Sequence, residues 1–480
     1  MPSTNFITKL RDNANNPVLK FTYDGVDKSV YLQSVGEIKR NIDLMPGYVQ
    51  VTVDNMTGEW DDFLKTHDEL TKKAEIIFGL SGFATKTATT IAFHENTPLA
   101  DTITDSGAGF VMGGFKAGMV INIDNSNGNG NDKDVTIASV TAGTITLIST
   151  DDLTDEGVGA NVTLLAESLA LFTGYVISAD YDYDTKSMTL TLRDRLSLAL
   201  ETRLQSITAG EVSPFWQNYY DKDNEKVDPT HVSDLVWNIL TLFSKLDGTL
   251  STENTDIDYT SWRAWGVTVD NAGYAIYDIG MIANGPACAD VLMKIAQLTN
   301  SYMWVGGEGK IKFIKGNAGG QWRHYKEEIL GVQWSVSMNG RVNYLSTKWG
   351  YHPDDNTWES DHDGVAENLL DHGPLVAPYQ YSEEIIEDTV VFHNLDTSAH
   401  LYNTTRLDRT AAPIRDFTVT TQLLGFAEDV RNCIALDDLY AAGANNYDDI
   451  VLEINSIAFI PETWEARITG QYIWTALELP

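Results

Sequence analysis

Short alternating runs of apolar and polar residues, separated by turn residues, are the feature that most constrains the fold of this chain. They fill much of residues 19–192 and return from residue 331 to residue 474. A period of two is typical of strands that bury one face, and Asp24-Gly25 is a turn signal between two such runs. Helical spacing is confined to the region between these stretches and to one later segment. We therefore expect a multi-domain, mainly β protein with α+β parts.

A block of different composition interrupts the first β stretch. Residues 91–165 are rich in Thr, Gly, Ala and Asp and almost free of basic residues. We predict that residues 88–166 form a small all-β module inserted into a first β-barrel domain of residues 1–87 plus 167–205, since domains with neighbouring termini tolerate such insertion. The expected strands of the host are 19–23, 29–38, 49–54, 74–78, 176–183 and 188–192, followed by a short helix or turn at 194–203, and those of the module are 119–123, 135–140 and 144–149.

A mixed α+β domain is expected over residues 206–330, before a second β-barrel domain with an outer loop region over 331–480. After His231, apolar residues recur with helical spacing as far as Phe243, and Gly285-Pro286 begins a second helical pattern. A hairpin follows at residues 302–314. In the second barrel domain the clearest strands are 342–349, 417–423, 450–459 and 464–474, with one helix at 398–409.

One weak internal repeat links the two β domains. Val176-Ile-Ser178, Leu190 and Thr191 reappear as Ile454-Asn-Ser456, Ile468 and Thr469, each displaced by 278 positions. Strand hairpins share Thr and Ile, so agreement by chance is an alternative. If the repeat is genuine, the chain carries two related β domains.

The chain is strongly acidic, with 33 basic and 68 acidic residues and a net charge of −35. Such a surface repels nucleic-acid phosphates and anionic membranes, so we expect no tight binding to either. A role in solubility is the ordinary explanation for such an excess. With 43% hydrophobic residues the chain can still build sizeable cores.

The cysteines and the N-terminus place no chemistry or targeting signal on the chain. Cys288 and Cys433 lie outside any metal-ligand or C-x-x-C spacing and are expected to be buried free thiols. The first residues lack the pattern of a signal peptide, and no apolar run is long enough to predict a membrane span.

Motifs that carry catalysis are weak in this sequence. No phosphate-binding loop or nucleophile elbow occurs, and His94-Glu95 lacks the second His of H-E-x-x-H. His352-Pro-Asp-Asp355 with Asp361-His-Asp363 could supply divalent-metal ligands, but a solvated acidic loop is the preferred interpretation. Residues 125–130 resemble the start of a calcium loop, yet the twelfth position is Thr136 and a hairpin loop fits better. Acid–aromatic neighbours at Glu59-Trp-Asp-Asp62 and Trp358-Glu359 leave glycan cleavage open as an alternative. We expect no catalytic residue, no metal and no cofactor.

Several stretches together resemble the hub proteins of bacteriophage tails. Residues 46–59 (PGYVQVTVDNMTGE), 171–178 (LFTGYVIS) and 190–194 (LTLRD) resemble the first barrel of such hubs. The helix after His231, the helix at 287–298 and the hairpin at 302–314 resemble the next hub domain, and 331–474 resembles the remainder in its order of strands. Residues 135–147 (VTIASVTAGTITL) give the inserted module a likeness to small β domains of tail and virion proteins.

The resemblance implies a structural protein of the virion, assembled in the host cytoplasm. It implies a homotrimer in which each subunit gives two tube-like β domains, so that three subunits match a six-fold tail tube around a DNA exit channel. Expected partners are the tail tube or distal-tail protein, the tip spike or fibre and the tape-measure protein. The alternatives are a six-fold distal-tail ring, a receptor-binding adaptor, or a glycan-acting tail hydrolase.

Overall fold

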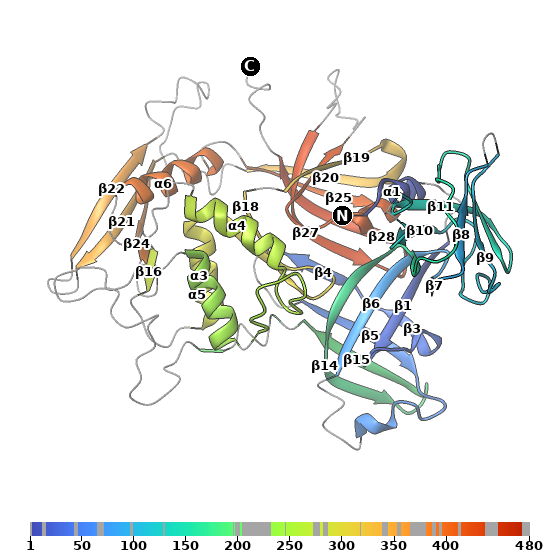
Figure 1. Ribbon diagram of the computed structural model, residues 1–480. Coiled ribbons are helices and arrows are strands. Elements are labelled where there is room, and N and C mark those ends of the chain that lie inside the picture. The colour runs from blue at the N-terminus through green and yellow to red at the C-terminus, as the bar shows by residue number, and fades with distance from the viewer. Residues whose placement is uncertain are drawn as a thin grey trace.

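Three large β sheets and a helical part make up the molecule, which we describe from a computed structural model (Figure 1). The sheet of the N-terminal strands lies below the C-terminal sheet in this view, the inserted module lies at the right edge, and the helices lie to the left. Each helix in the described part of the chain is too short or too polar to cross a membrane. The structure describes residues 2–11, 16–42, 47–64, 72–96, 99–127, 130–194, 196, 202–203, 232–244, 246–271, 279–281, 287–316, 318–337, 344–352, 357–364, 381–385, 390–392, 396–410, 414–436 and 450–472.

The first sheet contains seven strands in the order β2-β1-β6-β14-β15-β5-β3. Its hairpins follow the predicted pattern: Asp24 and Gly25, with φ of 51° and 74°, form the tight turn between β1 and β2. Alternation in β5 buries every second side chain in the common core. The strands are β1 (Pro17–Tyr23), β2 (Val26–Asp27), β3 (Leu32–Val35), β5 (Tyr48–Asp54), β6 (Lys73–Leu80), β14 (Ser168–Asp182) and β15 (Ser187–Arg193).

The single strand predicted over residues 29–38 is wrong. Ser29–Tyr31 form a 3₁₀ turn, η1, and the chain then splits into β3 and a separate strand β4 (Ile38–Asn41). The Ser29 hydroxyl accepts a hydrogen bond from the Phe21 backbone N–H at 2.9 Å, and this local side-chain contact competes with a continuous ladder.

The C-terminal sheet has the order β19-β26-β27-β28-β25-β20, and β4 adds to β27 beside this path. β19 and β4 both come from before the predicted domain start at residue 331. The 3₁₀ turns η6 (Lys326–Glu328) and η8 (Leu423–Ala427) connect its strands. The strands are β19 (Ala318–His324), β20 (Ile329–Ser337), β25 (Ile414–Thr421), β26 (Asn432–Leu436), β27 (Ile450–Ile460) and β28 (Glu465–Tyr472).

Six strands of the first sheet, β1, β3, β5, β6, β14 and β15, have counterparts at the same places in the C-terminal sheet, namely β19, β20, β25, β26, β27 and β28. Ala179 pairs with Leu190 in β14–β15, and Ile457 pairs with Ile468 in β27–β28. Both ladders carry an irregularity at the same place, between residues 176 and 178 and between residues 454 and 456, so the 278-residue repeat holds through the register and its bulge.

A second bulge extends the equivalence to the other end of each sheet. It lies between residues 32 and 34 in β3–β5 and between residues 329 and 331 in β20–β25, a displacement of 297. Bulges are specific features of a ladder, so two matched bulges indicate a genuine repeat. The described strands of both sheets form open half-barrels. The copies differ in that β1 is antiparallel to β6 whereas β19 is parallel to β26, and in that β2 and β4 have no counterpart among the described strands of the other sheet.

The inserted module is a sheet of its own, in the order β7-β13-β10-β11-β12-β9-β8. Its core is separate from that of the two half-barrels and is built around Phe110, Phe115 and Ile121. Four of its strands, β7, β8, β9 and β13, were not predicted. The strands are β7 (Thr85–Ala88), β8 (Ile91–His94), β9 (Thr102–Asp105), β10 (Val120–Asp124), β11 (Asp134–Val140), β12 (Thr144–Leu147) and β13 (Val162–Ala166).

The helical part has its own core, which crosses the predicted boundary at residue 331 because Leu345 and Tyr402 belong to it. The two helices predicted after His231 and Pro286 are confirmed as α3 and α5; α4 was not predicted. The segment predicted as helical over 194–203 lies mostly outside the described residues. The elements are α3 (Val232–Asn238), the π-helical turn η5 (Ile239–Phe243), α4 (Tyr259–Asn271), β16 (Ile279–Met281), α5 (Cys288–Leu298), β17 (Ser301–Val305), β18 (Ile311–Lys315), β21 (Tyr344–His352), β22 (Thr357–Gly364), β23 (Tyr381–Ile385), β24 (Val390–Phe392) and α6 (Asp396–Thr410).

A short N-terminal helix, α1 (Thr4–Arg11), lies where the module meets the half-barrels (Figure 1). Phe6, Ile7 and Leu10 on one face are buried in the core shared by both half-barrels. The Ser3 backbone N–H donates to Glu167 at 2.7 Å, and Asn5 donates to the Asp134 carbonyl at 3.1 Å. The helix therefore connects the inserted module to both half-barrels.

Candidate functional site

Among the described residues, the two ends of the candidate metal-ligand set lie at different places on one hairpin. His352 lies opposite Thr357 at one end of the β21–β22 hairpin, whereas Asp361 lies opposite Thr347. The two positions are roughly 16 Å apart along the ladder at about 3.3 Å per residue. Asp361-His-Asp363 is strand and not the predicted loop, and residues 353–355 lie outside the described part. Among the described residues, no group of three or more His, Cys, Asp or Glu side chains could hold a metal ion.

The calcium-loop candidate is a hairpin loop, as predicted. Its described residues, 125–127 and 130, lie in the connection between β10 and β11. Thr136, at the position where a bidentate Glu would be needed, lies in β11 and donates its backbone N–H to Asp151 at 2.5 Å.

The acid–aromatic candidate at Trp60 is part of a core. Its ring is 2% exposed and packs 6.2 Å from the ring of Phe21 and 5.5 Å from that of Tyr23. Asp61 accepts a hydrogen bond of 2.9 Å from Asn55, and Glu59 pairs with Lys28. Trp358 and Glu359 lie in β22, where only the backbone is described.

Both cysteines are buried free thiols, as predicted. Burial raises the pKa of Cys288. Burial also raises the pKa of Cys433, and the carboxylate of Glu453 adds to the effect. A raised pKa disfavours the thiolate, which is the reactive form.

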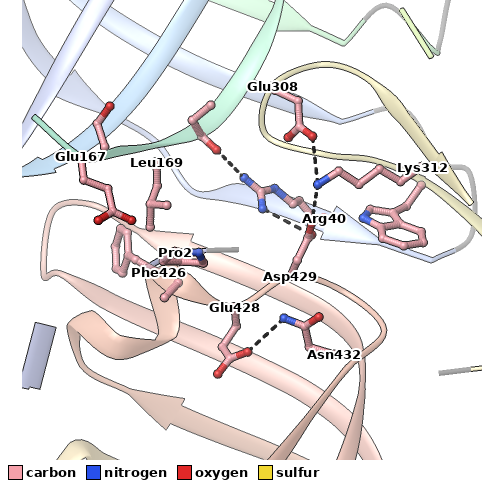
Figure 2. Close-up of a pocket in the computed structure, with 14 residues that line it drawn as sticks. Pro2, Arg40, Glu167, Leu169, Glu308, Lys312, Phe426, Glu428, Asp429 and Asn432 are labelled. Atoms are coloured by element: carbon pink, nitrogen blue, oxygen red, sulfur yellow. Dashed lines mark hydrogen bonds and ion pairs between the residues drawn. The ribbon is translucent and has the colours of Figure 1, made fainter. Parts of the chain in front are cut away.

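Charged side chains do converge where three parts of the molecule meet (Figure 2). The centre is the connection between η8 and β26, residues 428–431, which we call the joint segment. Arg40, on β4, lies 3.4 Å from Asp429 of this segment. The other guanidinium nitrogen donates to the backbone carbonyls of Ala170 and Leu171 in β14, at 2.9 and 2.8 Å. Arg40 therefore links the first half-barrel to the joint segment.

Lys312 links the helical part to the same carboxylate. It lies on β18, with its Nζ 3.2 Å from Asp429 and 2.9 Å from Glu308. The turn of this hairpin packs on the first half-barrel, where the Thr173 hydroxyl donates to the Gly307 carbonyl at 2.9 Å. Asp429 thus receives one cation from each of two neighbouring parts.

The pKa values at the joint follow from burial and from the mutual attraction of these charges. Burial acts to raise the pKa of Asp429, but Lys312 and Arg40 outweigh it and the pKa is lowered. Burial acts to lower the pKa of Lys312, but Asp429 and Glu308 outweigh it and the pKa is raised. Both groups therefore stay charged at neutral pH.

Two further buried pairs fix the joint segment. Glu428 and His324, both fully buried, lie 2.9 Å apart, which attaches the segment to β19. Arg431 pairs with Glu453 on β27, donates to the Gly316 carbonyl at 3.1 Å, and lies 3.5 Å from the ring centre of Tyr302. Buried pairs of this kind are costly to break from one side.

A cavity of about 470 Å³ lies beside the joint, between the half-barrels and the β17–β18 hairpin. Charged residues and apolar residues, including Trp304 and Phe426, line it together. Three of its charged side chains, Arg40, Lys312 and Asp429, are paired with one another. These pairs can fix the parts relative to one another, and the cavity is also lined by Glu167, whose pKa is raised by burial.

None of the joint residues was singled out from the sequence. Arg40 and Asp429 are 389 residues apart, and Lys312 and Asp429 are 117 apart. Local patterns carry no information about contacts at such separations. The one available signal was the scarcity of basic residues, which makes each Arg or Lys near an apolar run worth inspecting.

Comparison with known proteins gives structural similarity only. No family model matches the chain, and no curated protein matches it. The solved structures that are similar to it include one tail protein and two prophage tail proteins, all at low sequence identity. A tail protein from Neisseria meningitidis MC58 has a TM-score of 0.47 and 8% identity, over 95% of this chain and 96% of that one. The 43 kDa tail protein of prophage MuSo2 from Shewanella oneidensis has a TM-score of 0.43 and 11% identity, over 94% of this chain and 97% of that one. The prophage tail protein gp18 from Listeria monocytogenes EGD-e has a TM-score of 0.35 and 10% identity, over 89% of this chain and 95% of that one.

Proposed function

We propose that this chain is the structural hub of a bacteriophage tail tip or baseplate. Three copies form a ring that joins the six-fold tail tube to the central tip and surrounds the DNA exit channel. The chain acts as a virion protein without enzymatic activity, and it assembles in the host cytoplasm. Its partners are the tail tube or distal-tail protein, the tip spike or fibre and the tape-measure protein.

The observation that carries the proposal is the pair of equivalent half-barrels in one chain. They share strand order and two bulges at fixed displacements of 278 and 297 residues. A chain with two equivalent units needs three copies to present six, which is the arithmetic of an adaptor between three-fold and six-fold parts. The sequence resemblance to tail hubs supports the same assignment.

The joint segment gives this adaptor the rigidity that it needs. Asp429 attaches to β4 through Arg40 and to the β17–β18 hairpin through Lys312. A ring that transmits force from the tube to the tip must hold its two half-barrels at a fixed angle. These partly buried charge pairs supply directional contacts for that purpose, in addition to the shared apolar core.

We also propose the domain division over which this function is distributed. Residues 1–87 plus 167–205 form the first half-barrel domain and 88–166 form the inserted module. Residues 206–330 form the mixed domain and 331–480 form the second half-barrel domain with its outer region. β4 and β19 then act as exchanged strands that tie neighbouring domains together.

The test is the mass and shape of the purified chain. Mass photometry or sedimentation should give three times the subunit mass of 53.1 kDa, and negative-stain images should show a ring with a central hole. A hexamer would replace the hub by a six-fold distal-tail ring. A monomer at micromolar concentration would contradict both assignments.

A further inference from the structure

The two half-barrels differ at one edge, and the difference points to how copies of the chain join. In the C-terminal sheet, residues 450–453 of β27 pair with β26, and residues 456–459 pair with β4. In the first sheet, residues 168–175 of β14 pair with β6. The equivalent of the β4-paired segment is residues 178–181, which pair with β15 on one side and, among the described residues, with no strand on the other. We call residues 178–181 the β14 edge.

Side chains on the β14 edge are less covered than their equivalents in β27. Tyr181 is 37% exposed, whereas Phe459, displaced by 278, is fully buried. Phe459 is covered in part by Arg40 of β4, whose guanidinium lies 4.9 Å from the ring centre. Ile177 and Tyr183 beside the edge are also exposed, at 39% and 73%. An exposed strand edge with apolar side chains is a template for pairing with another strand.

In the C-terminal half-barrel, β4 pairs with the segment of β27 that corresponds to the β14 edge. The residues that correspond to β4 in the repeat lie at the end of an exposed edge strand of the same chain. β4 continues directly from β3, and the equivalent of β3 is β20, which ends the C-terminal sheet. β20 exposes Leu330 at 48% and Trp334 at 65%. Large exposed apolar side chains on a sheet edge need a cover, and Trp is a frequent centre of interfaces.

We propose that β20 of one copy pairs, antiparallel, with the β14 edge of the next copy. This contact between chains is equivalent to the pairing of β4 with β27 within a chain. It joins two different surfaces, so it is head-to-tail and forms a closed ring if successive rotations add up to a full turn. The assignment rests on the proposed three-copy ring for the number of subunits, and adds which strands join them.

The register of the contact follows from the contact inside the chain. Phe459 lies opposite Ile38, and Ile457 lies opposite Arg40. Displacing the β27 positions by 278 and the β4 positions by 297 places Tyr181 opposite Ser335. It also places Ala179 opposite Ser337.

Disulfide trapping tests the register directly. Chains carrying Tyr181→Cys and chains carrying Ser335→Cys, with different tags, are co-expressed and oxidised. Opposed Cα atoms in an antiparallel pair are about 4.5–5.5 Å apart, within reach of a disulfide. Disulfide-linked dimers with one chain of each kind should form. The control combines Val30→Cys with Ser335→Cys: Val30 is exposed but does not lie on the β14 edge, so this pair should not cross-link. The native Cys288 and Cys433 are buried and contribute little background.

The outcomes separate the two proposals. A trimer whose Tyr181 and Ser335 variants cross-link no more than the Val30 control overturns the strand contact and leaves the ring standing. A wild-type monomer overturns the ring. Dimers of two Tyr181→Cys chains overturn the head-to-tail arrangement, because only a two-fold contact brings identical positions together.

A second variant tests the contact without cysteines. Trp334→Ala removes an exposed side chain and should raise the dissociation constant of the trimer by on the order of tenfold or more. Leu99→Ala, which removes a side chain 76% exposed on the inserted module, should leave it unchanged. Equal dissociation constants for both variants would overturn the role of β20.

Discussion

At the scale of single residues, acidic side chains in this chain act as acceptors that fix its turns. In the inserted module, Asp101 accepts the backbone N–H of Leu153 at 2.6 Å, and Asp105 accepts that of Gly107 at 2.9 Å. Asp132 accepts the N–H of Ser126 in the same way, at 2.7 Å. Part of the acidic excess therefore has a structural use in addition to its effect on solubility, because loops rich in Gly and Thr have few other acceptors for their N–H groups.

Asp105 makes this use testable through pH. Burial acts to raise its pKa, but hydrogen bonds from Lys86, Thr90 and the Gly107 N–H outweigh burial and lower it to about 2 from an ordinary value of 3.8. A lowered folded-state pKa stabilises the fold above pH 3.8, and this contribution disappears as the pH falls towards 2. Asp105→Asn should lower the free energy of unfolding of the module by about 2 kcal/mol at pH 7 and remove this part of its acid sensitivity.

Amide hydrogen exchange of the module strands at pH 3 and pH 6 measures the effect. Asp152→Asn, at an exposed position of the same module, is the matched control. The same change in protection for both variants would show that the Lys86–Asp105 pair does not stabilise the module.

Asp429 gives a second prediction at this scale. Asp429→Asn removes the charge shared by Arg40 and Lys312 and should lower the free energy of unfolding by about 2 kcal/mol, because the carboxylate and its two partners are partly buried. The pKa of Asp429 is lowered, so its contribution is full above 3.8 and is lost at lower pH. The pKa of Lys312 is raised, so its contribution is full below 10.5 and is lost as the pH rises through the folded-state value. The difference in melting temperature between wild type and Asp429→Asn, measured by calorimetry, should therefore be largest between these two pH limits. Asp184→Asn, at an exposed position, should change the melting temperature little.

At the scale of elements, the sequence predicted strands and helices well where the pattern is local. β5, β6, α3, α5 and the β17–β18 hairpin follow from spacing and turn residues. α4 was missed because Thr and Val between its aromatic residues weaken the helical signal, although Trp262, Trp265 and Val269 keep helical spacing and are buried. The placement of β4 in the other half-barrel could not be predicted, since the partner of a strand is set by contacts far along the chain. The joint segment was missed for the same reason.

Gly307 tests how the β17–β18 hairpin is attached. A Cβ built on this residue would overlap the Ala170 carbonyl oxygen and the Arg40 guanidinium. Gly307→Ala should push the hairpin away from β14 and lower stability by about 1–3 kcal/mol, the usual range for overpacking. Gly157→Ala, where the added methyl meets open space, is the control. Equal melting temperatures for the two variants would show that the hairpin can move away without loss.

At the scale of the whole molecule, the net charge and the exposed strand edges have opposite effects on the association of copies. The half-barrels expose strand edges that favour association, while each copy carries a net charge of −35. Bringing like-charged copies together costs electrostatic free energy that the interface must exceed. The same charge repels DNA, so a ring of this chain would let DNA pass through its centre without retaining it.

This opposition predicts the effect of salt on assembly. The screening length is about 10 Å at 0.1 M salt and about 3 Å at 1 M, so added salt weakens repulsion between copies and leaves backbone pairing and apolar contacts intact. The dissociation constant of the proposed trimer should therefore fall when the NaCl concentration is raised about tenfold, from roughly 0.05 M to roughly 0.5 M, as measured by sedimentation equilibrium. Potassium glutamate at equal ionic strength should have the same effect, because screening does not depend on the identity of the ions. A trimer that instead dissociates as salt rises must be held by ion pairs between copies, and the neutral contact assigned to Trp334 and Ser335 would then be the wrong interface.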